Sequence, residues 1–562
     1  MWGKRAPWLC FVFVACADAE DPASPAPQDP MAQTECTPGE TRCATDQISV
    51  LRCNDSGEGW CYVADCGGPP FQGLCAEGTC VAVCDPSQKS YMGCDYVAVD
   101  LDNANVPCGT DAFGDRRYCN AAAGPFAVVV SNPDPRMTAY VRVTRGPLAA
   151  RAASMASCEV PPVDENFVRA VRIPPFGVAT LNLPRYDIEG TCQERRAYRV
   201  ASNVPIAAYQ FNPLDNVDVF SNDASLLLPT TALGTDYLVM TRESTFDRLK
   251  GFVTVVGVGP DPVEVTVIPS ADTFPGESIA GLVAGQTFTT TLGPLEVLNL
   301  ETLNVGGDLT GTRVRSSGPV AVFGGSEAAN VPNIKDQAIT CCADHLEQQM
   351  FPLDLWGTTY VAARSYPRGL EQDFWRILAS VDDTHVVLDP PVVAVPVLNA
   401  GQWFEFGADG DFSLVADKPV LLGQFLASQD APNPGKQPGD AGIGDPSFML
   451  TVPNQQLRSD YAFLAPDKYA EDYISVALPE GEVVLLDGQD MADIPGILLE
   501  AIGQSHWVSL RAPIADGYHQ LQCSKPCSVM VHGYDQYVSY GYPGGMDLRA
   551  EGDRLDRRGE TR

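Results

Sequence analysis

A short pattern that recurs four times constrains the fold of this chain more than any other sequence feature. In each copy a proline is followed by a run of mainly apolar residues, and successive prolines stand 100 to 114 residues apart. The prolines are Pro205, Pro319, Pro419 and Pro526. Proline is tolerated at the first residue of a strand, where the sheet loses no hydrogen-bond donor. The pattern therefore predicts four related units, each with a turn that leads into a buried strand.

A second pattern, built on a tyrosine, recurs with a similar period. The four tyrosines are Tyr96, Tyr237, Tyr360 and Tyr461, and in three copies a glycine stands three residues earlier. A buried tyrosine needs a partner for its hydroxyl group. We expect each ring to lie in the core of its unit with the hydroxyl bonded to a neighbour. The alternative interpretation is a ladder of four tyrosines that binds a ligand.

Further short apolar runs lie between the two patterns. Together with the tyrosine and proline strands they give about seven strands in roughly 100 residues, the strand count and spacing of a β-sandwich. Repeats of this kind also close into rings. The predicted fold is all-β, with tandem β-sandwich-like units or, as the alternative, a closed propeller-like ring. We expect units at about 86–215, 216–325, 326–428 and 429–545, and a disordered charged tail over 546–562.

The balance of charges excludes two classes of partner. The 562 residues include 71 acidic and 37 basic side chains, which gives a net charge of −34. A nucleic-acid binder needs clustered Lys and Arg, and so does a protein that docks electrostatically on anionic lipid. We therefore expect neither nucleic acid nor a bare membrane surface as a partner.

The first residues are typical of an export signal. A short basic start is followed by an apolar stretch that is too short to span a bilayer, so residues 1–17 are predicted to be a signal peptide. The segment ending at Cys16 resembles a bacterial lipobox, which makes Cys16 a candidate lipidation site; cleavage after Ala17, with free secretion, is the alternative. Residues 18–35 are acidic and rich in proline, and they predict an extended tether.

Cysteine usage supports export to an oxidising compartment. Of the 19 cysteines, eight stand between residues 36 and 84, which predicts a small disulfide module over 36–85. These are Cys36, Cys43, Cys53, Cys61, Cys66, Cys75, Cys80 and Cys84. No C-x-x-C pair occurs there, which argues against a zinc site. Further disulfide candidates are Cys158 with Cys192, Cys523 with Cys527, and the adjacent pair Cys341 and Cys342.

Several segments resemble one known family. They are Gly318-Pro-Val-Ala-Val-Phe-Gly-Gly325, Ala329-Asn-Val-Pro332, Cys342-Ala-Asp-His-Leu-Glu-Gln-Gln-Met-Phe-Pro352 and Val204-Pro-Ile-Ala-Ala-Tyr-Gln-Phe-Asn-Pro213. Together they resemble the IgG Fc-binding protein N-terminal domain family over about residues 90–540. The resemblance implies extracellular binding or adhesion and no catalytic activity, and the lipobox-like start suggests a bacterial member. Because a fold does not carry a ligand across a family, it does not imply that immunoglobulin is bound.

The most specific part of that resemblance contains a polar cluster. His345 is flanked by Asp344 and Glu347, and a carboxylate can orient an imidazole and raise its pKa. We expect this cluster either to clamp the loop from Ser326 to Met350 or to contact a ligand. Asp344 to Met350 could form one helical turn. Trp356 is a second candidate, either as a core residue or as an exposed binding residue.

No cofactor is predicted, although a structural calcium ion has a candidate site. Asp100, Asp102 and Asn105 lie in an oxygen-rich loop at a strand end, but the loop lacks the glycine and glutamate of an EF-hand. No G-x-S-x-G, H-E-x-x-H, P-loop or dinucleotide-binding motif is present, so we predict no enzyme.

Three functions fit these observations. The leading one is an exported binding or adhesion protein, anchored at the outer membrane or cell surface by lipid, which presents a β-array to an extracellular protein or glycan. The second is a secreted hydrolase of polymers that uses paired carboxylates. The third is an envelope scaffold without a soluble ligand.

Overall fold

The structure is a computed structural model of the chain. It describes residues 36–548 apart from 45–48, 67–72, 83–89, 111–115, 147–165, 216–220, 247, 334–341, 435 and 437–441. The predicted signal peptide, the tether, Cys16, Cys84, Cys158 and Cys341 lie outside the described residues. Within them, no helix is long and apolar enough to cross a membrane.

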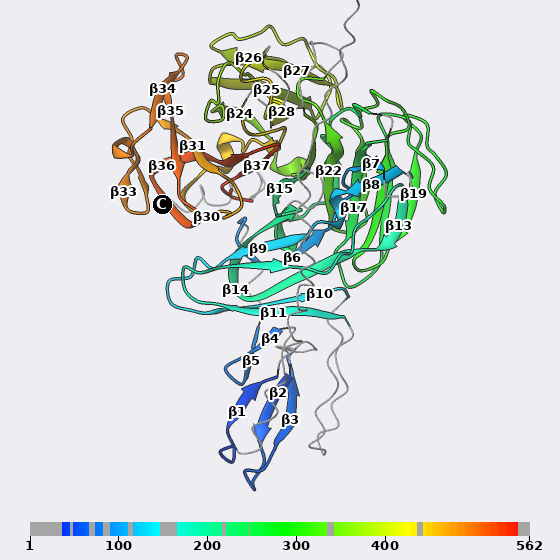
Figure 1. The fold of residues 1–562 in the computed structure, drawn as a ribbon, viewed down its shortest axis with the longest axis vertical. Helices are drawn as coiled ribbons and strands as arrows, with labels where there is room; N and C mark the ends of the chain where they lie inside the picture. Colours follow the sequence, from blue (N-terminus) through cyan, green and yellow to red (C-terminus); the bar gives the residue numbers. More distant parts are fainter. Residues whose placement is uncertain are drawn as a thin grey trace, which may run out of the picture.

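The chain is all-β, as the repeats predicted. The N-terminal module holds five strands, β1 (Thr41–Cys43), β2 (Ser49–Cys53), β3 (Trp60–Asp65), β4 (Gly73–Ala76) and β5 (Thr79–Ala82). Two disulfides, Cys43–Cys75 and Cys66–Cys80, link its two small sheets, Cys36–Cys53 ties the segment before β1 to β2, and Cys61 is also disulfide-bonded. These bridges confirm the prediction of a stapled module, which hangs below the first unit in Figure 1.

Four units follow the module, and hydrogen bonding defines where each begins and ends. The first holds β6 (Gly93–Val99), β7 (Asn105–Thr110), β8 (Arg116–Asn120), β9 (Ala127–Ser131), β10 (Ala139–Thr144), β11 (Phe167–Ile173), β12 (Val178–Asn182), β14 (Ala197–Asn212) and β15 (Asp223–Leu226). The second holds β16 (Asp236–Leu238), β17 (Gly251–Gly257), β18 (Val263–Ile268), β19 (Phe288–Leu292), β20 (Glu296–Glu301), β21 (Arg313–Ser316), β22 (Val320–Ala329) and β23 (Asp344–Gln349). Strand β13 (Cys192–Arg195) precedes β14 in the chain but pairs with β20 of the second unit.

The other two units repeat this plan. The third holds β24 (Gly357–Ala362), β25 (Asp373–Ala379), β26 (Val386–Asp389), β27 (Trp403–Ala408), β28 (Phe412–Phe425) and β29 (Phe448–Leu450). The fourth holds β30 (Arg458–Ala465), β31 (Glu471–Pro479), β32 (Val484–Leu486), β33 (Gln489–Asp490), β34 (Leu498–Ile502), β35 (Trp507–Ile514), β36 (Gly517–Asp535) and β37 (Val538–Pro543). Short 3-10 helices are η2 (Ala121–Ala123), η3 (Thr230–Ala232), η4 (Leu353–Leu355), η5 (Asn454–Gln456) and η6 (Met491–Asp493).

Each unit is a sandwich of two sheets that share one long strand. The first half of β14 pairs with β6 and β10, and its second half pairs with β9 and β15. Strands β28 and β36 cross between sheets in the same way. The second unit has two strands in place of the one long strand, with β21 in one sheet and β22 in the other. The repeated proline marks the crossing. In the second unit it lies between β21 and β22 and leads into a buried strand, as predicted. In the other three units it lies inside one long strand, so the prediction of a turn there was wrong.

The two repeated patterns of the sequence meet at this crossing. In every unit the tyrosine hydroxyl donates to the carbonyl oxygen of the residue after the proline, at 2.5 to 2.8 Å. The same hydroxyl accepts the backbone N–H three residues before the tyrosine. All four tyrosines are buried. The expectation of a core ring with a bonded hydroxyl is confirmed, and the tyrosines form no exposed ladder.

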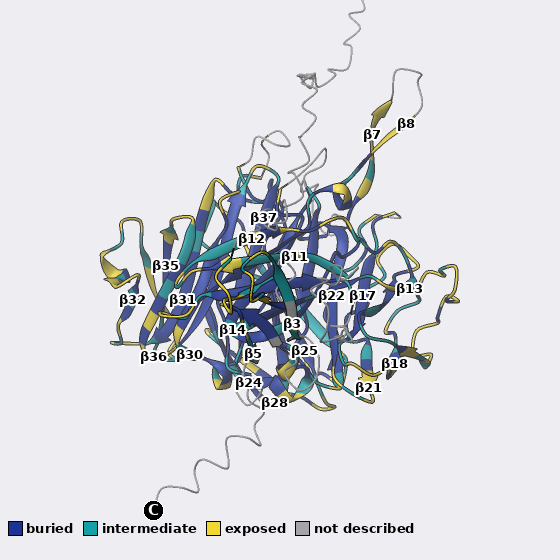
Figure 2. Cartoon of the chain, turned by 90° about the horizontal axis from the view of Figure 1, so that it is seen from below, coloured by how far each residue is buried: buried dark blue, intermediate teal, exposed yellow. Residues whose placement is uncertain are grey.

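The four units close into one ring around their last strands. These inner strands, β15, β23, β29 and β37, contact one another in cyclic order, and β37 returns to β15. Figure 1 shows the units arranged around this centre, and Figure 2 shows buried strands through the interior with the β7–β8 arm projecting outward. The structure thus combines both predicted architectures, because sandwich units form a closed ring. The expected boundaries at 215, 325 and 428 fall before the inner strands β15, β23 and β29, each of which pairs with the strand before it, whereas the boundary at 545 follows β37.

Glycine and proline make the junctions between successive units. A Cβ atom on Gly93, Gly234 or Gly357 would lie 2.4 to 2.6 Å from the Cβ atom of the proline that opens the next unit. These prolines are Pro229, Pro352 and Pro453. Since only hydrogen leaves room for the proline ring, the glycine of the tyrosine pattern is required by this contact.

Residues after the last strand complete the ring. The backbone N–H of Tyr91 donates to the carbonyl oxygen of Met546 at 3.1 Å, and Arg458 forms an ion pair with Asp547. Met546 and Leu548 are fully buried, although the sequence placed them in a disordered tail. The two ends of the repeat region therefore join each other directly.

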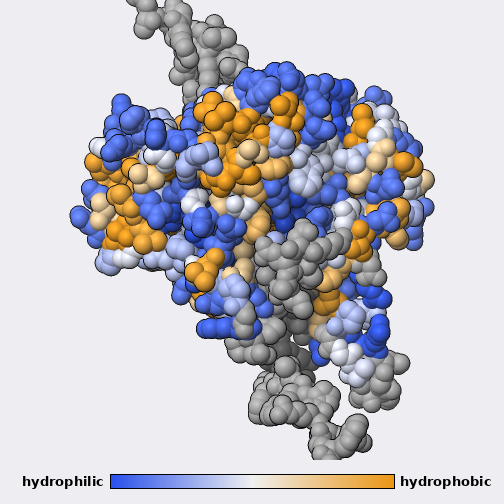
Figure 3. All heavy atoms as spheres, turned by 90° about the horizontal axis from the view of Figure 1, so that it is seen from above, coloured by the Kyte–Doolittle hydropathy of each residue, from blue (hydrophilic) through white to orange (hydrophobic). Residues whose placement is uncertain are grey.

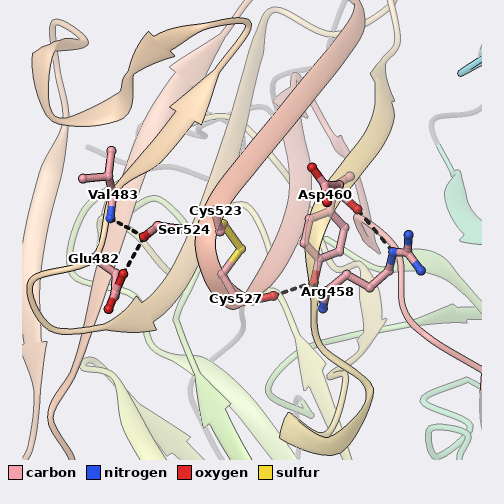
Figure 4. Close-up of a disulfide and its surroundings, with 8 residues drawn as sticks. Arg458, Asp460, Glu482, Val483, Cys523, Ser524 and Cys527 are labelled. Carbon is pink, nitrogen blue, oxygen red and sulfur yellow. Dashed lines mark hydrogen bonds between the residues drawn. A yellow bond between two sulfur atoms is a disulfide. The ribbon is translucent and has the colours of Figure 1, made fainter. Parts of the chain in front are cut away.

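Two further disulfide predictions have clear outcomes. Cys523 and Cys527 form the expected bridge, next to the carbonyl oxygen of Cys527 that accepts the Tyr461 hydroxyl (Figure 4). Cys192, in contrast, is a free thiol on β13, so its predicted pairing with Cys158 was wrong. Strand pairing places Cys192 opposite Asn299 of the second unit, a contact that sequence spacing could not reveal. Cys342 is disulfide-bonded.

Candidate functional site

The polar block that carried the family resemblance lies at the centre of the ring. Its residues form the inner strand β23, in which all six side chains are buried. The prediction of a helical turn here was wrong, and the expected loop from Ser326 to Met350 begins and ends as strand. A polar strand can be buried in this place because the other inner strands supply partners for its side chains.

Gln348 lies at the centre of the contacts between β23 and the other inner strands. Its Nε2 amide lies 2.7 Å from the carbonyl oxygens of Ala224 and Phe448 and 3.2 Å from that of Gly541. The three carbonyl groups belong to the inner strands of the other three units. One side chain therefore touches every other unit, and the sequence analysis did not select it as a site residue.

Asp344, His345 and Glu347 also link units rather than face solvent. The backbone N–H of Asn222, in the first unit, donates to Asp344, and Gln210 donates to Glu347 at 3.2 Å. His345 Nε2 lies 3.3 Å from Glu347 Oε2. Burial lowers the pKa of His345 to about 3 and raises that of Glu347, so burial disfavours a charge on either group. The expected rise in the His345 pKa was wrong, because desolvation outweighs the backbone hydrogen bonds that favour the charged imidazole.

Two buried aspartates in this region are only half satisfied by hydrogen bonds from the described residues. Asp344 Oδ1 accepts two backbone N–H groups and Asp445 Oδ1 accepts two others, whereas neither Oδ2 atom has a hydrogen-bond partner among the described residues. Burial, and then the charge of Asp445, raise the pKa of Asp344. Burial raises the pKa of Asp445 to about 7. The two carboxyl groups are thus a coupled acid pair inside the ring.

We predict that this pair makes the ring less stable as the pH rises. A carboxyl group whose pKa is about 7 in the folded chain and about 3.9 in the unfolded chain stabilises the fold fully below pH 3.9. That contribution, up to about 4 kcal/mol, is lost as the pH rises to 7. The Asp344→Asn variant keeps an oxygen for the two N–H donors and removes one charge. In urea unfolding it should be more stable than the parent at pH 8, with a smaller gain at pH 5; a gain that is equal at both pH values would contradict the pairing.

Trp356 is a core residue. Its side chain is 7% exposed, packs in the main hydrophobic cluster and donates from Nε1 to the carbonyl oxygen of Phe351 at 3.0 Å. The structure therefore removes Trp356 from the binding candidates, as it does the buried cluster on β23.

Two adjacent pockets lie where the first unit meets the second. One has a volume of about 410 Å³ and is lined by acidic side chains, among them Asp102, Asp187, Glu189, Glu301 and Glu327. The other, of about 360 Å³, is largely apolar and is lined by residues that include Val106, Pro107, Phe246, Leu249, Ala328 and Ala343. Asn105 and Arg248 line both pockets, which makes them one continuous surface feature beside the base of the β7–β8 arm. We call this feature the junction groove.

The floor of the acidic pocket holds carboxyl groups that are hard to ionise. Burial raises the pKa of Asp102 well above its ordinary value, that of Glu301 to about 7 and that of Glu327 to about 9. Of the three calcium candidates from the sequence, Asp102 and Asn105 line the groove. Asp100 instead accepts the backbone N–H of Tyr186 at 3.0 Å. Glu301 and Glu327 were missed because they stand about 200 residues further along the chain.

A second exposed apolar area lies on the third unit. Val387 and Val415 face each other across β26 and β28 and are 68% and 54% exposed, and Val392 and Val397 follow in the next loop. Figure 3, viewed from the side of this unit, shows apolar patches set among hydrophilic residues. This area is a sheet surface, whereas the junction groove is concave, so the junction groove is the stronger candidate.

The fold and the groove define a disulfide-stapled, all-β ring with a pocket at a junction of two units. The comparison with known families identifies it further. The family model described as IgGFc binding protein matches residues 223–533, more than half of the chain, and the chain belongs to that family. The match begins at the inner strand of the first unit and covers most of the next three. The predicted family resemblance is thereby confirmed over these residues.

One curated relative is the human IgGFc-binding protein. Its sequence is 37% identical to this chain over 140 residues, which is 25% of this chain and 2% of the human protein. The aligned part therefore spans only a small fraction of that relative.

Proposed function

We propose that this chain is an exported, non-catalytic binding protein that holds an extracellular protein partner in the junction groove. Membership of a family named for a binding activity is the observation that carries the proposal. The groove supplies the place, because a concave surface that is apolar at one end and charged at the other can both bury and orient a side chain. Figure 2 shows that the neighbouring β7–β8 arm projects beyond the ring, where a large partner could touch it.

The chemistry of the groove indicates the kind of partner segment that fits. Phe246 and Val106 line the apolar end, and Asp187 and Glu189 line the acidic end. An apolar side chain followed by a basic one would match both ends. The net charge of −34 would further favour partners with basic surfaces through long-range attraction.

The export signal and Cys16 support the localisation part of the proposal. We propose a bacterial lipoprotein in which Cys16 carries the lipid and residues 18–35 hold the ring away from the membrane. Replacing Cys16 by serine should release the protein from the membrane fraction and remove the lipid mass from its N-terminal peptide. Unchanged membrane attachment of the variant would contradict the anchor.

The binding function is tested by presenting purified residues 36–548 to an array of immobilised immunoglobulin Fc, mucins, other extracellular proteins, glycans and bacterial envelope fractions. We expect saturable binding to one class of protein, weakened by high salt because the groove is acidic. A sample with reduced disulfides is the control and should bind less. Binding to glycans alone would contradict a protein partner, and silence from a folded sample across the array would favour an envelope scaffold.

A further inference from the structure

Three carboxylates from distant parts of the sequence converge at the floor of the junction groove. Asp102 follows β6 in the first unit, whereas Glu301 ends β20 and Glu327 lies on β22 of the second unit. One oxygen atom of each lies within 4.8 Å of the others, and the three residues are only 5% to 7% exposed. Oxygen ligands of one calcium ion stand at 2.3–2.6 Å from it, so they are at most about 5 Å apart.

Among the described residues, one carboxylate at this floor has no hydrogen-bond donor from outside the acidic cluster. Asp102 accepts the backbone N–H of Gly190 at 2.7 Å, and Glu327 accepts that of Lys250 at 2.8 Å. The Glu301 carboxylate lines the pocket and shares a side-chain hydrogen bond with the carboxyl group of Asp102, which requires a proton between them. In the part of the chain that the structure describes, no N–H group donates to the Glu301 carboxylate. A buried carboxylate in this situation needs either a proton or a cation.

Basic side chains nearby do not form ion pairs with these acids. Lys250 Nζ lies 3.5 Å from the carbonyl oxygen of Leu303 and 5.5 Å from the centre of the Phe274 ring. Arg248 donates to the Tyr118 hydroxyl at 3.0 Å. Among the described residues, no ion pair includes Asp102, Glu301 or Glu327.

The next two junctions of the ring show how buried acids are neutralised elsewhere. Between the second and third units, Arg376 and Arg242 pair with Asp308 and Glu405. Between the third and fourth units, Arg511 pairs with Asp411 and Glu500. The corresponding strands of the three units can be matched by their pairing. Asn299 of β20, which stands two residues before Glu301, then corresponds to Glu405 of β27 and to Arg511 of β35. At the first junction this position is therefore an uncharged asparagine, and among the described residues no arginine forms an ion pair with the three acids nearby.

We propose that Asp102, Glu301 and Glu327 bind one calcium ion at the junction of the first two units. The ligand atoms are all oxygen, which suits a hard cation, and the three residues include neither the His nor the Cys that a zinc site would use. The ion takes the electrostatic place of the arginines at the other junctions and ties the first unit to the second. Affinities of extracellular calcium modules lie at about 10⁻⁴ to 10⁻³ M, which the protein would meet after export.

Calorimetry and thermal unfolding of the purified chain, first treated with a chelator, test this site. We expect calorimetry to show one calcium ion per chain with a Kd of about 1 mM or below. We also expect 5 mM calcium to raise the unfolding midpoint, with a smaller effect for 5 mM magnesium. Absence of binding heat and of a midpoint shift at 5 mM calcium would overturn the proposal.

A charge-neutral variant separates calcium binding from a purely structural role. Glu301→Gln should lose both the binding heat and the calcium-dependent rise in midpoint, while its calcium-free midpoint is no lower than that of the parent. Glu327→Gln is the second variant if the first does not fold. The matched control, Glu405→Gln at the second junction, should lower the midpoint with and without calcium and keep the calcium-dependent rise. Retention of one bound ion by Glu301→Gln would contradict the assignment.

Discussion

A chain that ends at residue 543 is expected to be much less stable than one that ends at residue 548. The five residues in between bury Met546 and Leu548, donate from the Asp547 N–H to the carbonyl oxygen of Gln456 at 2.8 Å, and accept the Tyr91 N–H. Burial of each apolar side chain contributes about 1.5–3 kcal/mol. With the hydrogen bonds, the expected loss in the free energy of unfolding is roughly 4–6 kcal/mol.

Urea unfolding of the two truncated chains measures this difference. The chain that ends at residue 548 is the matched control, and its midpoint should equal that of the full-length protein. The shorter chain should also expose the junction of the first and fourth units, seen as faster amide exchange in Tyr91 and in β30. Equal midpoints for the two truncations would show that the ring does not depend on joining its ends.

Replacement of Arg376 by methionine is the second change with a large expected effect. The guanidinium group donates to Asp308 at 2.7 Å and to Glu405 at 2.9 Å and stacks over Trp403 at 3.8 Å. Although burial opposes ionisation of Asp308, Arg376 lowers its pKa, so this carboxylate is charged. Arg376→Met keeps most of the side-chain volume and leaves that charge buried. Removing one partner of a buried ion pair costs about 3–5 kcal/mol.

An exposed arginine of the second unit provides the control. Arg315 lies 3.6 Å from Asp236, and the two side chains are 58% and 38% exposed. Arg315→Met should change the free energy of unfolding by less than about 0.5 kcal/mol, because solvent screens such a pair. If both variants lost the same stability in urea unfolding, the buried network would not hold the junction together.

Most of the fold could be predicted from the sequence repeats, because the spacing and type of residues are local properties of a sequence. The tyrosine and proline patterns predicted four β-units, and the cysteine cluster predicted the stapled module. Neither pattern predicts the hydrogen bond between Tyr237 and the residue after Pro319. Its partners stand about 80 residues apart, and such a contact does not affect local periodicity. The ring itself follows from contacts between β15 and β37, which are more remote still.

The site was less predictable than the fold for a specific physical reason. A segment with the polarity of Asp344 to Gln349 suggests a turn or an exposed loop, because buried strands are usually apolar. It is buried here because inner strands from other units supply its partners, such as the carbonyl groups around Gln348. Asp102 could be selected from its acidic loop, whereas Glu301 and Glu327 stand in otherwise ordinary strand sequences.

Binding by a groove variant tests the central claim, that the junction groove holds a protein partner. Phe246 is 37% exposed at the apolar end, and Val387 is 68% exposed on the third unit, so Phe246→Asp and Val387→Asp add the same charge in different places. Each folded variant is measured by biolayer interferometry against the partner found on the array. We predict at least a tenfold loss of affinity for Phe246→Asp and less than a twofold change for Val387→Asp. Full affinity of Phe246→Asp, or a loss confined to Val387→Asp, would place the partner elsewhere and contradict the account.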